Sequence, residues 1–295
     1  MTPVDAAAVR NAPGWQAELR LRFNRDAAGP LRQGRTRLVE RHHRGPLIVQ
    51  RPFYPEGDPC HVYLVHPPGG VVGGDALRID ATVDPGAHAL ITTPAATKFY
   101  RCDGRVSTQT QELHAQGATL EWLPQENIFY RGADVSTATR IQIDANSRVV
   151  GWEINCLGLP ARGEHFDTGA LRLDLELWKS PAAAQLHVPV NLPIFMDRMR
   201  LSGDSAARRA AWGLAGQEAI GTLLATPATQ EQVESVRELI VAHDYAAVSL
   251  VDGVLVLRAL APQAEAVRRL FIAAWQRLRP GIVGRPAVLP RIWST

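Results

Sequence analysis

Hydrophobic and polar residues alternate with a period of two from residue 15 to about residue 225. The alternation is clearest over residues 15–23, 77–84 and 171–178, where apolar side chains alternate with charged or polar ones. Such alternation is typical of strands with one buried and one solvated face. Shorter apolar runs, bounded by Gly, Pro, Asp and Asn, occupy residues 62–65, 89–93, 118–123, 139–143 and 149–154. The pattern predicts a body of many short strands.

The hydrophobic period changes to that of a helix near the C-terminus. Thr229 and Gln232 match a capping box, and the apolar residues that follow them predict a helix over about residues 229–243. A second apolar stripe predicts a helix over about residues 262–279. We expect Pro280 and Gly281 to end this second helix, because proline disrupts the helical hydrogen bonds.

Asp252-Gly253 separates two apolar runs between these helices, and this dipeptide is typical of a tight hairpin turn. The expected fold class is therefore mainly β. A β-rich body covers residues 1–226, and a small α+β part covers residues 227–295, with two helices flanking the hairpin. We expect the two parts to form one continuous structural unit. The tail, residues 281–295, is rich in Pro and Gly but apolar, which favours a tail docked on the body.

The composition narrows the class of protein. The chain has 295 residues, of which 46% are hydrophobic and 21% charged, and its formal net charge is +3. This weak charge, without clusters of Lys and Arg, argues against a nucleic-acid partner. No run approaches the ~18 apolar residues of a membrane span. The sequence contains no CxxC pair, and its first residues lack the pattern expected of a signal peptide. We therefore expect a cytoplasmic protein without a structural zinc site or disulfide framework.

The segment HPPGGVVGGD, residues 66–75, combines four glycines and two prolines with a polar residue at each end. Gly69 and Gly74 have the spacing of a phosphate-binding loop, but Asp75 stands where that loop needs lysine. The surrounding pattern is not βαβ, so a dinucleotide site is not supported. From the residues alone, a tight turn between two strands is the favoured interpretation.

Other residue types offer few candidates for chemistry. No GxSxG or HExxH motif occurs, and Cys60 has no clustered partners for a metal. Glu126 in LPQEN and Glu153 in WEIN are possible paired carboxylates of a β-rich hydrolase. Nothing in the sequence places these two glutamates near each other, so the hydrolase remains an alternative.

Four segments together resemble signature segments of the urease accessory protein D family, UreD, also called UreH. They are HPPGGVVGGD at 66–75, TTPAATKFYR at 92–101, LEWLPQENIFY at 120–130 and GRPAVLPRIW at 284–293, and they occur in the family's order. The motif positions carried over from this resemblance are Gly69, Gly70, Gly73, Gly74, Lys98, Tyr100, Arg101, Pro124, Gln125, Arg291 and Trp293.

The resemblance implies a cytosolic scaffold for urease maturation and not an enzyme. It implies that the chain binds accessory protein F, which recruits the GTPase accessory protein G, and that the assembly docks on apo-urease. It also implies a mostly β fold with two helices near the C-terminus, and a water-filled passage that carries nickel.

The resemblance and ligand chemistry together suggest residues for this passage. Asp75 and Glu126 are the best candidates for lining it, together with His66. Ni²⁺ accepts nitrogen and oxygen ligands, and a transit path should hold it with few of them. We therefore expect no permanently bound cofactor, only Ni²⁺ in transit. A purely structural adaptor that touches no metal is the other alternative.

Overall fold

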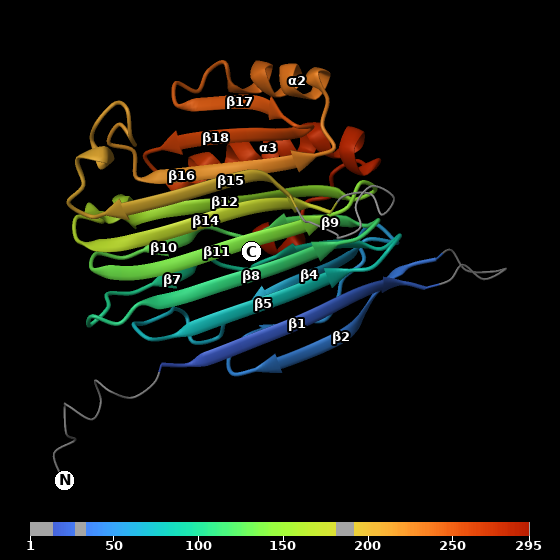
Figure 1. The fold of residues 1–295 in the computed structure, drawn as a ribbon, viewed down its shortest axis with the longest axis horizontal. Coiled ribbons are helices and arrows are strands. Elements are labelled where there is room, and N and C mark those ends of the chain that lie inside the picture. Colours follow the sequence, from blue (N-terminus) through green and yellow to red (C-terminus); the bar gives the residue numbers. More distant parts are fainter. Residues whose placement is uncertain (1–13, 27–33, 181–191, 295) are drawn as a thin grey trace, which may run out of the picture.

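Two β-sheets, packed face to face, dominate the fold (Figure 1). The computed structural model describes residues 14–26, 34–180 and 192–294. The predicted mainly β class, with two helices beside a hairpin near the C-terminus, is confirmed. The stretch from which we expect no signal peptide lies almost entirely outside the described residues.

The first sheet has seven strands in the described residues and keeps one face in solvent. In the strands over residues 16–25, 76–83 and 169–179, the inward positions are mostly apolar and the outward positions mostly polar, as the burial of alternate residues shows. In spatial order the strands are β15 (Leu192–Ser202), β14 (Gly169–Lys179), β11 (Ala133–Ile143), β8 (Ser107–Ala115), β5 (Ala76–Val83), β1 (Gln16–Arg25) and β2 (Thr36–Arg44).

The second sheet has eleven strands in the described residues, and its central strands are buried on both faces. Its main path is β17 (Ala246–Val251), β18 (Val254–Ala261), β16 (Ala219–Thr226), β12 (Arg148–Leu159), β9 (Thr119–Leu123), β6 (His88–Thr92), β4 (Cys60–Val65) and β3 (Ile48–Val49). Three short strands join it at β12, namely β10 (Asn127–Phe129), β7 (Thr97–Phe99) through β10, and β13 (Glu164–His165).

The chain crosses repeatedly from one sheet to the other between β4 and β14. Strands β5, β8, β11 and β14 pair in parallel in the first sheet, and β4, β6, β9 and β12 pair in parallel in the second. Parallel neighbours need a long crossover connection, which is a helix in most proteins. Here a strand of the opposite sheet serves as the crossover. Successive strands therefore alternate between the two sheets and enclose one apolar interior.

Helices α2 (Gln230–Ile240) and α3 (Ala264–Val283) pack on the second sheet, and α3 covers β12 and β16 on its outer face. The predicted capping box of Thr229 and Gln232 is present. The turn at Asp252 and Gly253 is also confirmed, with φ of +49° and +76° at these residues. In the part of the chain that the structure describes, no helix combines the length and apolar character needed to cross a membrane.

Both predicted helix ends need correction. Helix α2 ends at Ile240 and not at His243, because the residues after its apolar stripe are exposed. Helix α3 continues through Pro280 and Gly281 to Val283 and ends at Gly284, whose φ is +78°. The hydrogen bond lost at Pro280 is offset because Ile282 and Val283 remain buried against the sheet.

A fully buried arginine fixes α3 on the sheet. Arg279 donates to Glu121 at 2.9 Å and to Glu56 at 2.7 Å. His88 lies 2.6 Å from Glu121, and His61 lies 2.7 Å from Glu56. Burial opposes the charged form of Glu121, but the hydrogen bonds and charges of His88 and Arg279 outweigh it and lower its pKa to about 2. This cluster joins four segments that are distant in sequence.

Trp293 of the C-terminal tail packs against the body. The ring of Trp293 packs against those of Trp152 and Trp275, with centroids 5.9 and 5.8 Å apart. Its indole N–H donates to the hydroxyl of Thr92 at 3.0 Å. The tail therefore covers the end of β6 and the N-terminal half of β12.

Candidate functional site

Two cavities lie between the sheets, on either side of the central strands β11 and β12. The first, of about 190 Å³, is enclosed by β5 and β8 on one side and β4, β9 and β12 on the other. The second, of about 420 Å³, lies beneath β14 and β15, against β12, β16 and β18. The interior of the sandwich is thus hollow on both sides of its centre.

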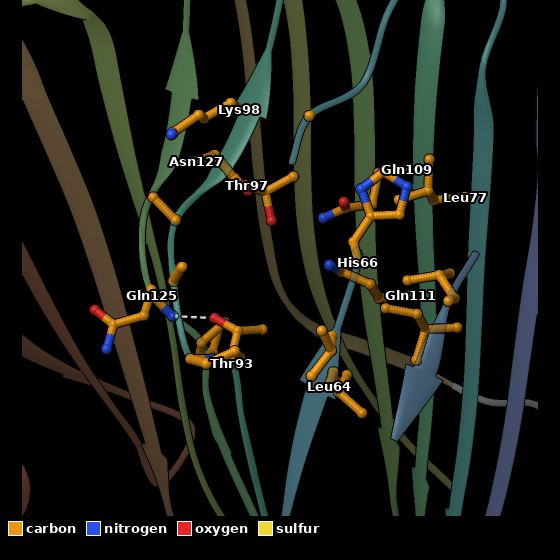
Figure 2. A pocket seen from close by; sticks show the side chains of 18 of the residues that line it. Leu64, His66, Leu77, Thr93, Thr97, Lys98, Gln109, Gln111, Gln125 and Asn127 are labelled. Carbon is orange, nitrogen blue, oxygen red and sulfur yellow. Dashed lines mark hydrogen bonds between the residues drawn. The ribbon is translucent and has the colours of Figure 1, made fainter. Parts of the chain in front are cut away.

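The first cavity lies beside the predicted 66–75 turn (Figure 2). Its rim includes exposed Gly69 and Ala95, so it opens to solvent there, and its walls include His66 and Lys98. The indole N–H of Trp122, on the inner wall, is buried and has no hydrogen-bond partner among the described residues. This donor is available to water or to a ligand oxygen inside the cavity.

The second cavity also opens to solvent at one end. Exposed Asp244 and Tyr245 line its outer end, and buried Glu153 and Asn155 line its inner end. Asp197 on its wall forms an ion pair with Arg258 at 3.0 Å. The cavity therefore extends from the surface to the middle of the sandwich.

Glu153 lines both cavities and is the only carboxylate among the described residues that line the first. The hydroxyl of Thr139 bonds to a carboxyl oxygen of Glu153 and to the amide oxygen of Gln111. A hydroxyl has one proton and can donate to only one oxygen. Both hydrogen bonds can form if Glu153 is protonated. The carboxyl group of Glu153 then donates to the Thr139 hydroxyl, and that hydroxyl donates to the amide oxygen of Gln111.

The surroundings of Glu153 allow a large share of that protonated form near neutral pH. Burial raises the pKa of Glu153 to about 7, and the negative charge of Asp197 adds to the shift. Hydrogen bonds from Thr139 and Asn155 oppose it. A carboxyl with such a pKa can bind or release a proton, or exchange it for a cation, under ordinary cellular conditions.

Glu153 belongs to an interior polar cluster that bridges the two cavities. Its members face inward from the neighbouring strands β8 and β11 of the first sheet and from β12 of the second, and all are buried: Gln109, Gln111, Thr137, Thr139, Glu153 and Asn155. Sequence reasoning treats Glu153 only as one of a catalytic pair. One sequence feature could have revealed this cluster: the inward positions of some strands carry polar side chains, as in STQTQ at residues 107–111.

The 66–75 and 92–101 segments pack directly on each other. The Val71 N–H donates to the Lys98 carbonyl at 2.7 Å. A Cβ atom at Gly70 would lie 2.1 Å from the ring of Tyr100, so only glycine fits there. Gly73 is similarly tight, because a Cβ atom there would lie 2.9 Å from the Arg105 carbonyl. Gly69 and Gly74, which also belong to this motif, have φ of +80° and +91°.

The other two signature segments join the same region. Strand β10 of the 120–130 segment pairs with β7 of the 92–101 segment, and Pro124 accepts a hydrogen bond from Trp152 at 2.7 Å. Gln125 donates through its N–H to Thr93 at 2.9 Å (Figure 2) and accepts from Arg268 at 2.6 Å. In the tail segment, the backbone of Arg291 is hydrogen bonded to Tyr63. Residues of the first three segments therefore line the first cavity, whereas the tail segment packs on its neighbour Tyr63 and contributes no lining residue.

Asp75 and His66, at the two ends of the turn, have different surroundings. The Asp75 carboxylate is buried and accepts the N–H groups of Trp15 at 2.8 Å and Val72 at 3.0 Å. This arrangement fits the turn-capping role that aspartate often has. His66 lines the first cavity, where burial lowers the pKa of its ring while the charge of Asp75 opposes the shift. His66 therefore offers a neutral nitrogen to the cavity at neutral pH.

Glu126 and Arg101 lie outside the lining. The described residues that line the first cavity include neither Asp75 nor Glu126. One carboxyl oxygen of Glu126 is buried without a hydrogen-bond partner in the described residues. Arg101 packs over Gly132, where a Cβ atom would lie 2.8 Å from its side chain. Thus, of the predicted nickel ligands, only His66 faces the first cavity.

The described residues hold no group of three or more His, Cys, Asp and Glu side chains that could bind a metal tightly. Cys60 is buried and makes a hydrogen bond to Tyr54, and burial raises the pKa of its thiol to about 11. Such a thiol stays protonated and is a poor metal ligand. Any cation in this interior would meet isolated ligands.

Comparison with known proteins assigns the family. The family model described as UreD urease accessory protein matches residues 16–294. A relative named urease accessory protein UreD from Pseudomonas putida (strain W619) is 43% identical over 96% of this chain and 95% of its own length. Namesakes from Citrobacter koseri and Klebsiella aerogenes are also 43% identical over 96% of this chain, and over 92% and 97% of their own lengths. The chain therefore belongs to the UreD family of urease accessory proteins.

Proposed function

We propose that this urease accessory protein conducts Ni²⁺ through its interior to apo-urease, in the cytoplasm. In this proposal it binds accessory protein F and, through it, the GTPase accessory protein G, and it has no catalytic activity of its own. One observation carries the nickel path: two cavities that open to solvent at different places end at the same carboxyl group, that of Glu153.

The ligands along this path suit a cation in transit. Ni²⁺ takes nitrogen and oxygen ligands, and each additional charged ligand slows its release. His66 offers one nitrogen near the rim, and Glu153 offers one carboxylate at the centre. The amides and hydroxyls between them, such as Gln111 and Thr139, can hydrogen bond to the water molecules of a hydrated ion. This donor set supports passage and not storage.

Asp75 and Glu126 keep a place in the proposal, each on a different ground. Asp75 holds the turn that carries His66, so we propose that it acts by positioning. Glu126 has a buried carboxyl oxygen without a partner among the described residues, which supports a contact with water or with the ion. The hydrolase alternative has less support, because only Glu153 of the carboxylate pair faces the first cavity.

The test is co-expression of this chain with the urease subunits and the other accessory proteins at limiting nickel. Glu153→Gln should lower the nickel content and activity of urease several-fold while the complex with accessory protein F still forms. The matched control is Glu238→Gln on α2, where the glutamate side chain is 76% exposed. Full nickel loading with Glu153→Gln would contradict the path and favour the purely structural adaptor.

A further inference from the structure

Strand β2 lies at an edge of the first sheet, and most of its residues are exposed (Figure 1). Its neighbour β1 buries alternate residues, such as Leu19 and Leu21, in the core. The β2 residues that pair with these two leucines, His43 and Arg41, are exposed. Strand β2 therefore extends past the cover of the second sheet, and solvent reaches both of its faces.

One row of backbone groups along β2 faces away from the sheet. In an antiparallel pair, every second residue directs its N–H and C=O toward the neighbouring strand, and the residues between direct theirs away. Strand β1 pairs with one row, and no described strand pairs with the other. After a bulge at Val39, residues 40–44 pair regularly with β1. At about 3.4 Å per residue, they offer about 17 Å of regular edge to an added strand.

The exposed part of β2 is positively charged. Residues 36–44 include three arginines and two histidines but only one acidic residue. Arg37 is paired within the chain. Arg41 and Arg44 form no hydrogen bond or ion pair with the described residues, and Glu18, which lies across from Arg44, pairs with another arginine at 3.7 Å. Two guanidinium groups at this edge can therefore bind an anion without losing a partner in the described fold.

We propose that β2 docks an acidic, extended segment of a partner protein, which adds to the first sheet as a further strand. The free row of N–H and C=O groups calls for an extended chain, because a strand can pair with the whole row. Arg41 and Arg44 are three residues apart and so lie on opposite faces of the sheet. Carboxylates on either face of the added strand thus meet a guanidinium, which can bind them with two parallel hydrogen bonds.

Charge complementarity indicates that the segment comes from another protein. The residues outside the described ranges contain one acidic residue, Asp5. A second copy of this chain does not supply the acid through its longer edge strands, because β2 and β15 have more arginines than acidic residues and β17 carries no charge. A nucleic acid fits less well, because its affinity grows with the number of phosphate contacts, and this edge offers two unpaired arginines.

The experiment measures, by fluorescence anisotropy at low salt, how tightly the full chain binds a labelled decapeptide of alternating glutamate and valine. Arg41→Glu combined with Arg44→Glu should weaken binding about tenfold or more, because two attractive contacts become repulsive. The matched control is Arg237→Glu combined with Arg269→Glu on α2 and α3, where these side chains are 50% and 73% exposed. It changes the net charge equally and should stay within about twofold of the unmodified chain. Both double variants should keep the melting temperature of the unmodified chain.

A change in the peptide tests strand pairing separately from charge. Successive residues of a strand direct their N–H groups to opposite edges. N-methylation of two successive central residues therefore removes an N–H from each edge of the peptide and leaves its charge unchanged. This change should weaken binding about tenfold, since donors to the β2 carbonyls are lost. Binding of the unmodified peptide should also weaken in about 0.5 M salt, which screens exposed charges.

Four outcomes would overturn the docking edge. Absence of peptide binding would mean that the arginines only protect the edge against self-association. Equal binding of the N-methylated peptide would exclude strand addition, and an equal loss in the control variant would exclude β2 as the site. Tighter binding of a single-stranded oligonucleotide than of the peptide would identify a nucleic-acid partner. None of these results bears on the nickel path, because no described residue of β2 lines either cavity.

Discussion

Replacing Glu153 by glutamine should stabilise the protein at alkaline pH, even though we expect it to impair nickel delivery. The folded interior disfavours the charged carboxylate, since burial raises the pKa of Glu153 to about 7 from an ordinary value of 4.5. Glutamine cannot ionise, and its amide can still donate a hydrogen bond to Thr139. The substitution therefore removes the free-energy cost of burying a charged carboxylate and keeps the hydrogen bond with Thr139.

The magnitude follows from the pKa difference between the folded and unfolded states. Each pKa unit corresponds to about 1.4 kcal/mol, so this shift corresponds to about 3 kcal/mol. Because the folded state holds the Glu153 proton more tightly, the free energy of unfolding falls as pH rises from about 4.5 to 7. Above pH 7 the carboxyl group is charged in both states, and the loss is complete.

Urea unfolding at pH 5 and pH 8, followed by tryptophan fluorescence, measures this effect. Comparing Glu153→Gln with the unmodified chain at each pH cancels the titration of all other groups. At pH 8 the variant should be more stable by about 2–3 kcal/mol, and at pH 5 the two should differ by less than about 1 kcal/mol.

The outcome that refutes this reasoning is a stability difference that is the same at both pH values. Equal stability at pH 8 would mean that the carboxylate is charged and well solvated inside the sandwich. The control Glu238→Gln changes a glutamate whose side chain is 76% exposed, so it should not reproduce the gain in stability of Glu153→Gln at pH 8.

Four further predictions test other contacts. Arg279→Met should destabilise the protein by about 3–5 kcal/mol in urea unfolding, because two buried glutamates lose their cation; adding Glu121→Gln should recover part of this, and no recovery would argue against the pairing. In acid, the unmodified chain should lose stability as pH falls from about 4.5 toward 2, whereas Glu121→Gln should lose less. Deleting residues 284–295 should lower the melting temperature and soluble yield, because Trp293 loses its contacts; an unchanged melting temperature would contradict a docked tail. Asp75→Ala should cost about 2 kcal/mol because two backbone N–H groups lose their acceptor, and Asp75→Asn should cost less; an equally stable alanine variant would show that this cap is dispensable.

The hydrophobic pattern predicted the burial of the strands better than their arrangement. The alternating stretches at 15–23, 77–84 and 171–178 became β1, β5 and β14 of the sheet with one solvated face. Most of the short apolar runs became strands of the other sheet, which the helices cover. The pattern did not predict that the chain crosses between the sheets at each step, because parallel pairing depends on contacts between distant residues.

Local rules failed where tertiary contacts opposed them. Pro280 was expected to end the second helix, but the buried apolar stripe continues to Val283 and outweighs the lost hydrogen bond. Glu153 was not predicted as the meeting point of two cavities, because its partners Gln111 and Thr139 come from separate strands. The 66–75 turn was predicted correctly, since proline and glycine determine its backbone locally.

The placement of α3 and the tail has a consequence for synthesis of the chain on the ribosome. Trp275 and Arg279 complete the contacts of Glu121, which is made 154 residues before Trp275. At a synthesis rate of about 5–20 residues per second, the apolar outer face of β9 and β12 stays exposed for about 8–30 s until α3 is made. During this time Trp152 and the buried carboxylate of Glu121 have no protection from neighbouring chains. Soluble yield should therefore depend on translation speed and on chaperones that hold the nascent chain, and frameshifts near the end of the gene should be as damaging as those in its middle.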